Sequence, residues 1–186
     1  MNDTKSEILK IGDELIRQKG FNAFSYYDIS KKMGIRHAAI HYHFPTKCDL
    51  GMAIIRKYGE GFQMHVQSSN NKPPIQRIKS FLNLFSIPHK ERTVCIMGAL
   101  TPEMSTFDQA MQEALVTQTK DILEWLQGVL EEGFENGSMW YSESPRTRAL
   151  LILTSMMSSL SITRITGSRD FVSIKNAILN EIILKK

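Results

Sequence analysis

The sequence predicts an all-α protein with a small N-terminal head of three helices and a larger helical body. Apolar residues recur at helical spacing along most of the chain, and glycines and prolines interrupt them where helices would end. We find no segment that alternates polar and apolar residues between turn signals, as a β-hairpin would. The 186 residues, 42% hydrophobic and 23% charged, are enough for a substantial core.

The first helix is predicted from a helical repeat of apolar residues, Ile8, Ile11, Leu15 and Ile16, which Gly20 brings to an end. A second helix follows a capping signal. Ser25 can cap it, and Asp28, three residues later, is an acidic variant of the capping box.

The second helix carries an apolar face of Ile29 and Met33 that we expect to point inward. Gly34 then supplies a left-handed turn that a Cβ atom would penalise. These signals predict two helices joined by a tight glycine turn.

A short third helix is predicted from His37 to Phe44, with polar and aromatic side chains exposed around one buried residue, Ile40. Pro45 ends it, and Thr46 with Asp49 forms the capping box of the next helix. Two helices joined by a tight turn, the second short and rich in hydrogen-bond donors, fit the major groove of DNA. The segment therefore predicts a helix-turn-helix.

Residues 8 to 55 resemble the DNA-binding signature of the TetR/AcrR family of bacterial transcriptional regulators. The shared features are the pair Gly20-Phe21 after the first helix, Phe44 at the end of the helix-turn-helix, and Lys47 just beyond it. This chain has Ser30, Arg36 and His41 where the family most often has Ala, Ser and Tyr.

The resemblance implies a DNA-binding head at residues 1–47 and a ligand-binding and dimerisation domain at residues 48–186. It also implies that the last two helices pair with those of a second subunit in a four-helix interface. Repression, rather than activation, is expected from the resemblance alone.

The body is predicted to begin with a helix running from Thr46 towards Val66, followed by a polar linker, Ser68 to Pro74. Pro74 opens the next helix, which Pro88 should end. Residues 93–105 suggest one or two brief helices broken at Pro102.

A long helix is predicted from about Phe107 to Glu135, closed by Asn136-Gly137. The next helix starts at Ser144-Pro145, with Ser144 as its cap, and runs to Gly167. Because it is apolar nearly all round, we expect it to be covered on more than one side.

The last helix, Asp170 to Leu184, carries two apolar stripes. We expect one stripe to pack against its own domain and the other to pack against a partner. A lone monomer would leave much of this surface wet, so the two helices predict a homodimer. Dimerisation also places two heads about one DNA turn, roughly 34 Å, apart on a pseudo-palindromic operator.

The net charge of +4 is modest, but its distribution is uneven. Residues 1–60 hold ten Lys/Arg against seven Asp/Glu, whereas residues 103–143 hold one against nine. Phosphate would repel the acidic middle, which leaves the N-terminal part as the DNA-facing end. Alternatively, the acidic residues are simply the solvated face of a helix.

Arg36 is the best candidate for a bidentate guanine contact, and Ala38 or Ala39 for contact with a thymine methyl group. His37 and His41 lie near the leading edge of the same helix. The candidates for phosphate contact are Ser25, Tyr26, Tyr42, His43, Thr46 and Lys47. The alternative is that these are plain surface residues of a small helical head.

The effector pocket is expected among apolar residues of the body, because Met and aromatic side chains accommodate irregular apolar ligands. The candidates are Phe85, Met97, Met104, Phe107, Met111, Leu115, Trp125, Met156 and Met157. The alternative is that these residues belong to an ordinary hydrophobic core, which also places apolar residues at helical spacing. The composition of this set favours a hydrophobic or aromatic effector.

The two cysteines, Cys48 and Cys95, cannot form a disulfide framework and indicate a reducing compartment. Either thiol could sense oxidants or electrophiles. For Cys48, the preceding Lys47 and the start of a helix favour the thiolate form. The alternative is that both cysteines are buried and inert.

A metal site at His37, His41 and Cys48 would lack a full ligand set, so we expect no metal and no cofactor. We also expect no enzymatic activity: we find no glycine-rich phosphate loop and no nucleophile elbow. His89 with Glu91, or Glu103 with Asp108, could form acid–base pairs, but their spacing does not require it.

The N-terminus lacks the apolar stretch of a signal peptide. The longest apolar region, Ala149 to Thr163, is bounded by Arg148 and Arg164 and falls short of the roughly 20 residues that span a bilayer. We therefore expect a cytoplasmic protein without a membrane segment.

The sequence as a whole predicts a dimeric, ligand-responsive transcriptional regulator that binds a double-stranded DNA operator. Effector in the body would tilt the connecting helix Lys47–Val66 and lower operator affinity by a coupling of about 1–3 kcal/mol. The alternative is a helical adaptor that uses the head to bind another protein. Such an adaptor would not bind DNA, and its partner binding would not depend on salt concentration.

Overall fold

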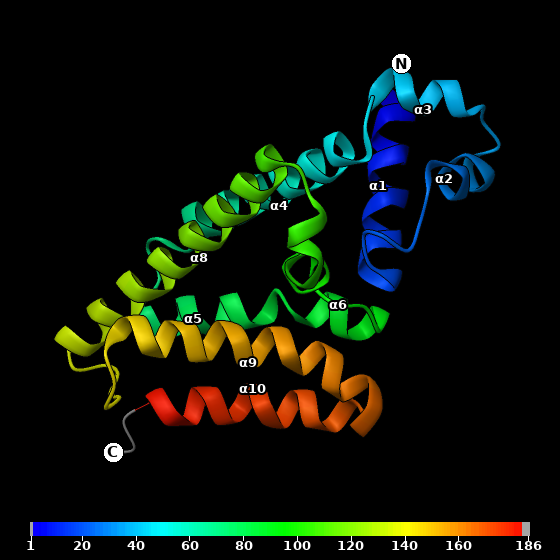
Figure 1. The fold of residues 1–186 in the computed structure, drawn as a ribbon. Helices are drawn as coiled ribbons and strands as arrows, with labels where there is room; N and C mark the ends of the chain where they lie inside the picture. Colours follow the sequence, from blue (N-terminus) through cyan, green and yellow to red (C-terminus); the bar gives the residue numbers. More distant parts are fainter. Residues whose placement is uncertain (1, 184–186) are drawn as a thin grey trace. The chain divides into compact units, whose positions relative to one another are not determined.

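The structure, a computed structural model, describes residues 2–183 and is built from α-helices (Figure 1). Within this range no strand is present beyond an isolated bridge between Met139 and Ile183. The predicted all-α class is confirmed. The elements are α1 (Asn2–Lys19), α2 (Tyr26–Met33), α3 (His37–His43), α4 (Lys47–Ser69), α5 (Pro74–Asn83), α6 (Ser86–Glu91), α7 (Ile96–Leu100), the 3-10 helix η1 (Thr101–Thr106), α8 (Gln109–Glu135), α9 (Pro145–Thr166) and α10 (Ser168–Ile182).

The chain folds into two compact units. The head unit contains the described residues up to Gly61 together with Ile96–Gln118. The body unit contains Phe62–Cys95 and the described residues from Thr119 onward. The helices α4 and α8 each contribute residues to both units. The functional boundary predicted after residue 47 is a separate matter and stays a prediction.

The head unit has the core that the helical periodicity predicts. Ile8 and Ile16 of α1, Ile29 of α2 and Leu50 of α4 are all fully buried. A close helix contact depends on Gly51 of α4, where an added Cβ atom would lie only 2.5 Å from Cε of Met111. The first turn of α4 therefore packs directly against the start of α8.

Prolines account for the differences between the predicted and observed helix ends. Pro88 does not end a helix; it is the third residue of the short α6. A first-turn proline is tolerated because its missing N–H would have no partner inside the helix. Pro102 lies in the first turn of η1, which follows α7 directly, so the prediction of two brief helices that meet near this proline is confirmed. The polar linker is also shorter than predicted, since α4 continues through Ser69.

In the body unit, α9 and α10 lie side by side (Figure 1). The Ser144 hydroxyl accepts the backbone N–H of Thr147 at 3.1 Å, so the predicted cap of α9 is confirmed. Arg148, buried in the first turn of α9, donates to Glu143 and to Glu181 of α10, each at 2.7 Å. The pair with Glu181 joins the start of α9 to the end of α10, whereas the pair with Glu143 lies within the segment that leads into α9. Leu184, the predicted end of the last helix, lies outside the described residues.

The face of α9 that does not meet the rest of the body unit is apolar and exposed. Ile152, Met156 and Leu160 are buried, whereas Leu151 is 44% and Ile162 52% exposed. By length and composition alone α9 could cross a membrane, so the expectation that it is too short for a span is wrong. That criterion carries little weight, because a buried core helix of a soluble protein also meets it.

Candidate nucleic-acid interface

The turn between α2 and α3 is held by the residues that the sequence singles out. The carboxylate of Asp28 accepts the backbone N–H of Ser25 at 2.7 Å and its hydroxyl at 2.9 Å. These hydrogen bonds lower the pKa of Asp28. At the other end of α2, Gly34 adopts the left-handed conformation, with φ 66° and ψ 28°. Both predicted helix ends are confirmed, and they set the direction in which α3 leaves the turn.

The helix α3 presents one continuous polar and aromatic surface, anchored from beneath by a single side chain. Ile40 is the one fully buried residue of α3. We use the name recognition surface for the exposed residues at and around α3, which are Arg36, His37, Ala38, His41 and Tyr42. Ala39 and His43 are half-buried at its edges. Among the seven residues of α3, Ile40 is the one that packs fully into the head, so it holds the recognition surface in place.

Aromatic contacts join the recognition surface to α2. The ring of His41 meets the ring of Tyr26 edge to face at 4.9 Å, and His41 Nδ1 lies 3.1 Å from the carbonyl oxygen of Pro45. The ring of His37 lies 6.1 Å from that of Tyr27. Tyr27 is 60% exposed, so it adds a further donor beside α3. Tyr27 directly follows Tyr26 in the sequence, which is the signal that could have identified it.

Two of the predicted phosphate contacts face the interior of the head. Tyr26 is 8% exposed, and its hydroxyl donates to the backbone carbonyls of Phe44 and Thr46, the first at 2.9 Å. Burial raises its pKa. This position ties α2 to the segment between α3 and α4, which favours a positioning role over direct contact with DNA.

Lys47 is similarly directed inward. Its Nζ donates to the carbonyl oxygen of Phe24 and lies 4.2 Å from the ring centre of Phe24 and 4.8 Å from that of Phe21. Burial lowers the pKa of Lys47. The ammonium group thus stabilises the segment between α1 and α2 by hydrogen bonding and cation–π contact.

The remaining predicted phosphate contacts are accessible. Thr46 forms the predicted capping box with Asp49: the carboxylate accepts the Thr46 N–H at 2.8 Å and its hydroxyl at 2.7 Å. Ser25 and Thr46 are both exposed, and Tyr42 is 76% exposed. Ser25 and Thr46 lie just before α2 and α4, and Tyr42 belongs to the recognition surface on α3 itself.

The predicted effector-pocket residues divide between the two units. Met97, Met104, Phe107, Met111 and Leu115 lie in the head unit, and Phe85, Trp125, Met156 and Met157 lie in the body unit. Most are buried, as either a pocket wall or a core requires. Their role in binding a ligand stays a prediction.

Trp125 has the most distinctive environment of this set. Its ring meets Phe62 edge to face at 5.7 Å and His65 at 5.5 Å, and Arg77 lies 5.8 Å from the ring centre. Burial lowers the pKa of His65. The indole N–H of Trp125 is buried and has no hydrogen-bond partner among the described residues. An acceptor on a ligand would satisfy it.

The two thiols are partly buried and lie in different units: Cys48 in the head unit and Cys95 in the body unit. Burial raises the pKa of Cys48, and neighbouring Asp108 and Asp49 add to the rise. A raised pKa opposes the thiolate that the helix start favours, so the local environment does not activate Cys48.

The other groups considered from the sequence have structural partners. Glu103 accepts the backbone N–H of Asn22 at 2.7 Å, and Asp108 accepts that of Met111 at 2.8 Å at the start of α8. The ring of His89 stacks on Phe171. Among residues 2–183 no group of three or more His, Cys, Asp or Glu side chains is arranged to hold a metal ion.

A short, exposed recognition helix on a capped three-helix head defines a DNA-binding protein of the helix-turn-helix class. Residues 8–54 match the family model described as "Bacterial regulatory proteins, tetR family". The head therefore carries the DNA-binding domain of the TetR family, and the proteins that the chain resembles are transcriptional regulators of that family, which bind DNA and are not enzymes.

Similar proteins extend the likeness over nearly the whole chain. The HTH-type transcriptional repressor NemR of Escherichia coli is 21% identical over 95% of this chain and 91% of its own length. An uncharacterised HTH-type regulator of Lactococcus lactis is 24% identical, over 66% of this chain and 65% of its own length.

Solved structures share the fold. A TetR regulator of Legionella pneumophila superposes with a TM-score of 0.86 at 29% identity and covers 98% of both chains. A TetR-family regulator of Agrobacterium tumefaciens gives 0.90 at 24% identity, over 98% of this chain and 99% of that one.

Proposed function

We propose that this protein is a cytoplasmic repressor that binds a pseudo-palindromic operator as a homodimer and is released by a small-molecule effector. Residues 1–47 would bind DNA, and residues 48–186 would bind the effector and the second subunit. The observation that carries the proposal is the recognition surface, which exposes Arg36, His37, His41 and Tyr42 around the buried Ile40.

The chemistry of the recognition surface suits base readout. The Arg36 side chain is exposed at the first position before α3, where a guanidinium can reach the O6 and N7 atoms of guanine. Ala38 and the half-buried Ala39 are small enough to approach a thymine methyl group. Ser25, Tyr42 and Thr46 supply hydroxyl donors for phosphate.

The exposed face of α9 supports a dimer. Between Arg148 and Arg164 this helix has no charged residue, and its solvent-facing positions are apolar or small hydroxyl side chains such as Thr154 and Ser158. Ile162 on α9 and Val172 on α10 are each 52% exposed. Pairing these helices with those of a second copy would remove the apolar surface from water.

Release by an effector would operate through α4, which begins in the head unit and continues into the body unit. An effector that binds among the proposed pocket residues would shift α4 and change the spacing of the two heads. The similar protein NemR is named as a transcriptional repressor, which supports a repressor role for this protein. A coupling of about 1–3 kcal/mol between effector and operator, a 5- to 150-fold change, is sufficient.

The test is fluorescence anisotropy with labelled DNA from upstream of the protein's own gene, in excess scrambled duplex and at two salt concentrations. Binding that resists competitor and weakens steeply with salt would support the proposal. Absence of binding even at low salt would favour the adaptor reading instead. Binding that scrambled duplex abolishes would contradict an operator at this location.

A further inference from the structure

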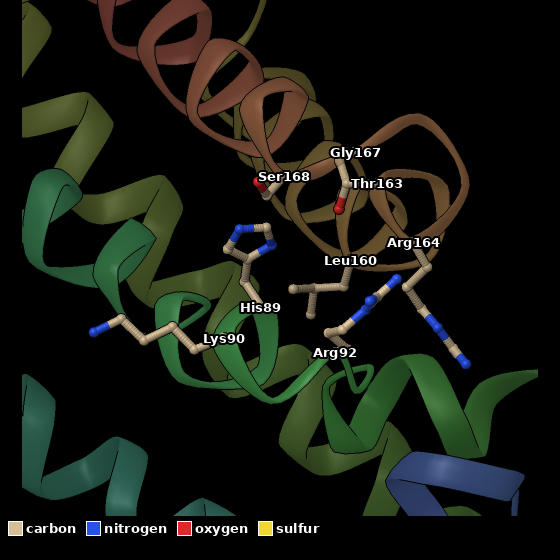
Figure 2. A pocket seen from close by; sticks show the side chains of 8 residues that line it. All are labelled: His89, Lys90, Arg92, Leu160, Thr163, Arg164, Gly167 and Ser168. Atoms are coloured by element: carbon tan, nitrogen blue, oxygen red, sulfur yellow. The ribbon is translucent and has the colours of Figure 1, made fainter.

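A basic cleft lies in the body unit where α6 faces the junction of α9 and α10 (Figure 2). Its volume is about 540 Å³. Figure 2 shows His89 of α6, Leu160 and Thr163 of α9, and Arg92 just after α6 around one hollow, whereas Lys90 extends away from it. None of the residues proposed for the effector pocket lines this cleft.

The charge of the cleft is unbalanced. Its lining residues include Arg92 and Arg164 and no acidic residue. Among the described residues, neither guanidinium has an ion-pair or hydrogen-bond partner. Glu91 and Asp170 are the acidic residues nearest in sequence, and neither lines the cleft. Two unpaired guanidinium groups that share one hollow attract an anion, and their planar forks match the oxygens of carboxylate or phosphate.

The walls of the cleft are held in place without a ligand. The ring of His89 stacks on Phe171 with ring centres 4.0 Å apart and an interplanar angle of 8°. Phe171 is itself buried in α10. Arg92 ends α6 in a left-handed conformation, with φ 54°, and its N–H donates to the carbonyl of His89 at 3.1 Å. The backbone that carries both groups therefore has a defined conformation.

The cleft also has an apolar side. Leu160 is buried in its lining. A neighbouring hollow of about 580 Å³ shares Arg92 and Arg164 and adds Ser161 and Ile165, the latter 85% exposed. The two arginines therefore lie beside both polar and apolar lining residues. A molecule with an acidic group and an apolar portion could contact both kinds of surface.

We propose that this cleft binds a small organic oxyanion, a carboxylate or phosphate ester with an apolar group, with Arg92 and Arg164 as the anion-binding residues. His89, Thr163 and Ser168 line the hollow around the anion. The site goes beyond the proposed function, because binding here requires neither DNA nor the residues proposed for the effector pocket.

The experiment is isothermal titration calorimetry on the full chain without DNA, with phenyl phosphate, benzoate and inorganic phosphate as probes. We expect saturable binding of phenyl phosphate or benzoate that is stronger than binding of inorganic phosphate, because of the apolar wall. Phenyl phosphate alone would identify phosphate esters as the ligands, and competition by benzoate would extend the site to carboxylates.

The variant that tests the residues is Arg92→Ala with Arg164→Ala. We expect it to bind at least about tenfold more weakly, because hydrogen bonds to charged groups are the stronger ones in proteins. The control, Lys79→Ala with Arg146→Ala, removes the same charge from exposed positions of the same unit outside the cleft. Circular dichroism melting checks that both variants fold, and Arg164→Gln provides a milder change.

The proposal is overturned if neither organic probe binds, or if the cleft variant and the control lose affinity equally. Failure of operator binding in the anisotropy experiment would leave this result untouched, so the two proposals are tested separately.

Discussion

Replacing Tyr26 by Phe tests whether this residue positions the recognition helix or contacts DNA itself. The hydroxyl of Tyr26 donates to the carbonyl oxygens of Phe44 and Thr46, which lie between α3 and α4. The substitution keeps the buried ring and removes only the hydroxyl. It leaves the Phe44 carbonyl, whose hydrogen bond is buried, without this donor.

The expected cost follows from this geometry. A typical hydrogen bond contributes about 0.5–1.5 kcal/mol net, and a buried group left unsatisfied costs about 1–3 kcal/mol. Because Tyr26 serves one buried and one part-buried carbonyl, we expect Tyr26→Phe to lower the free energy of unfolding by about 1–3 kcal/mol. Urea denaturation measures this as a lower midpoint at an unchanged slope.

The matched control is Tyr42→Phe on the recognition surface, where the side chain is 76% exposed. It should change the free energy of unfolding by less than about 0.5 kcal/mol. If Tyr42 contacts phosphate, this variant should instead weaken operator binding. Equal stability of the two variants, with loss of operator binding only in Tyr26→Phe, would refute the positioning role and favour direct phosphate contact by Tyr26.

Three further predictions concern the operator, the dimer and pH. Arg36→Ala should weaken specific binding by roughly 1–3 kcal/mol in anisotropy titrations, and equal loss on scrambled DNA would contradict a base contact. Ile162→Glu should yield monomers in light scattering after size exclusion, whereas Met64→Glu, at an exposed position of α4, should not; the same mass for both would argue against this interface. Hydrogen bonds from Arg148 lower the pKa of Glu143 in the folded protein, so its stabilisation is present above its unfolded pKa and is lost as pH falls through the folded value. The melting temperature should therefore fall less between about pH 5 and pH 3 in Glu143→Gln than in the unaltered protein, and equal falls would show that the pair is not linked to stability.

The helix ends of the head could be predicted because they depend on short-range chemistry. Ser25 with Asp28, and Thr46 with Asp49, form their capping boxes between residues three apart, and Gly34 needs only its own left-handed conformation. The same holds for Ser144 at the start of α9. A side chain that reaches three residues along the chain meets its partner whatever the rest of the molecule does.

The orientation of the candidate DNA-binding residues could not be predicted in the same way. Tyr26 and Lys47 look like surface donors in the sequence, yet the first bonds to the segment after α3 and the second to Phe24. Their partners are 18 to 23 residues away, so the contacts exist only once the three helices have packed. The sequence shows that Tyr26 and Lys47 can donate hydrogen bonds, but it does not show which carbonyl groups accept them.

Pattern and spacing thus determined on their own that this chain is helical, that it carries a helix-turn-helix, and that Ile40 anchors the recognition helix, since each follows from local periodicity and caps. The tertiary structure alone decided which donors remain free on the recognition surface. It also brought Arg92 and Arg164, 72 residues apart in the sequence, to one cleft. Helical periodicity specifies which face of a helix is apolar, whereas the choice of neighbours for each face is made when the helices pack.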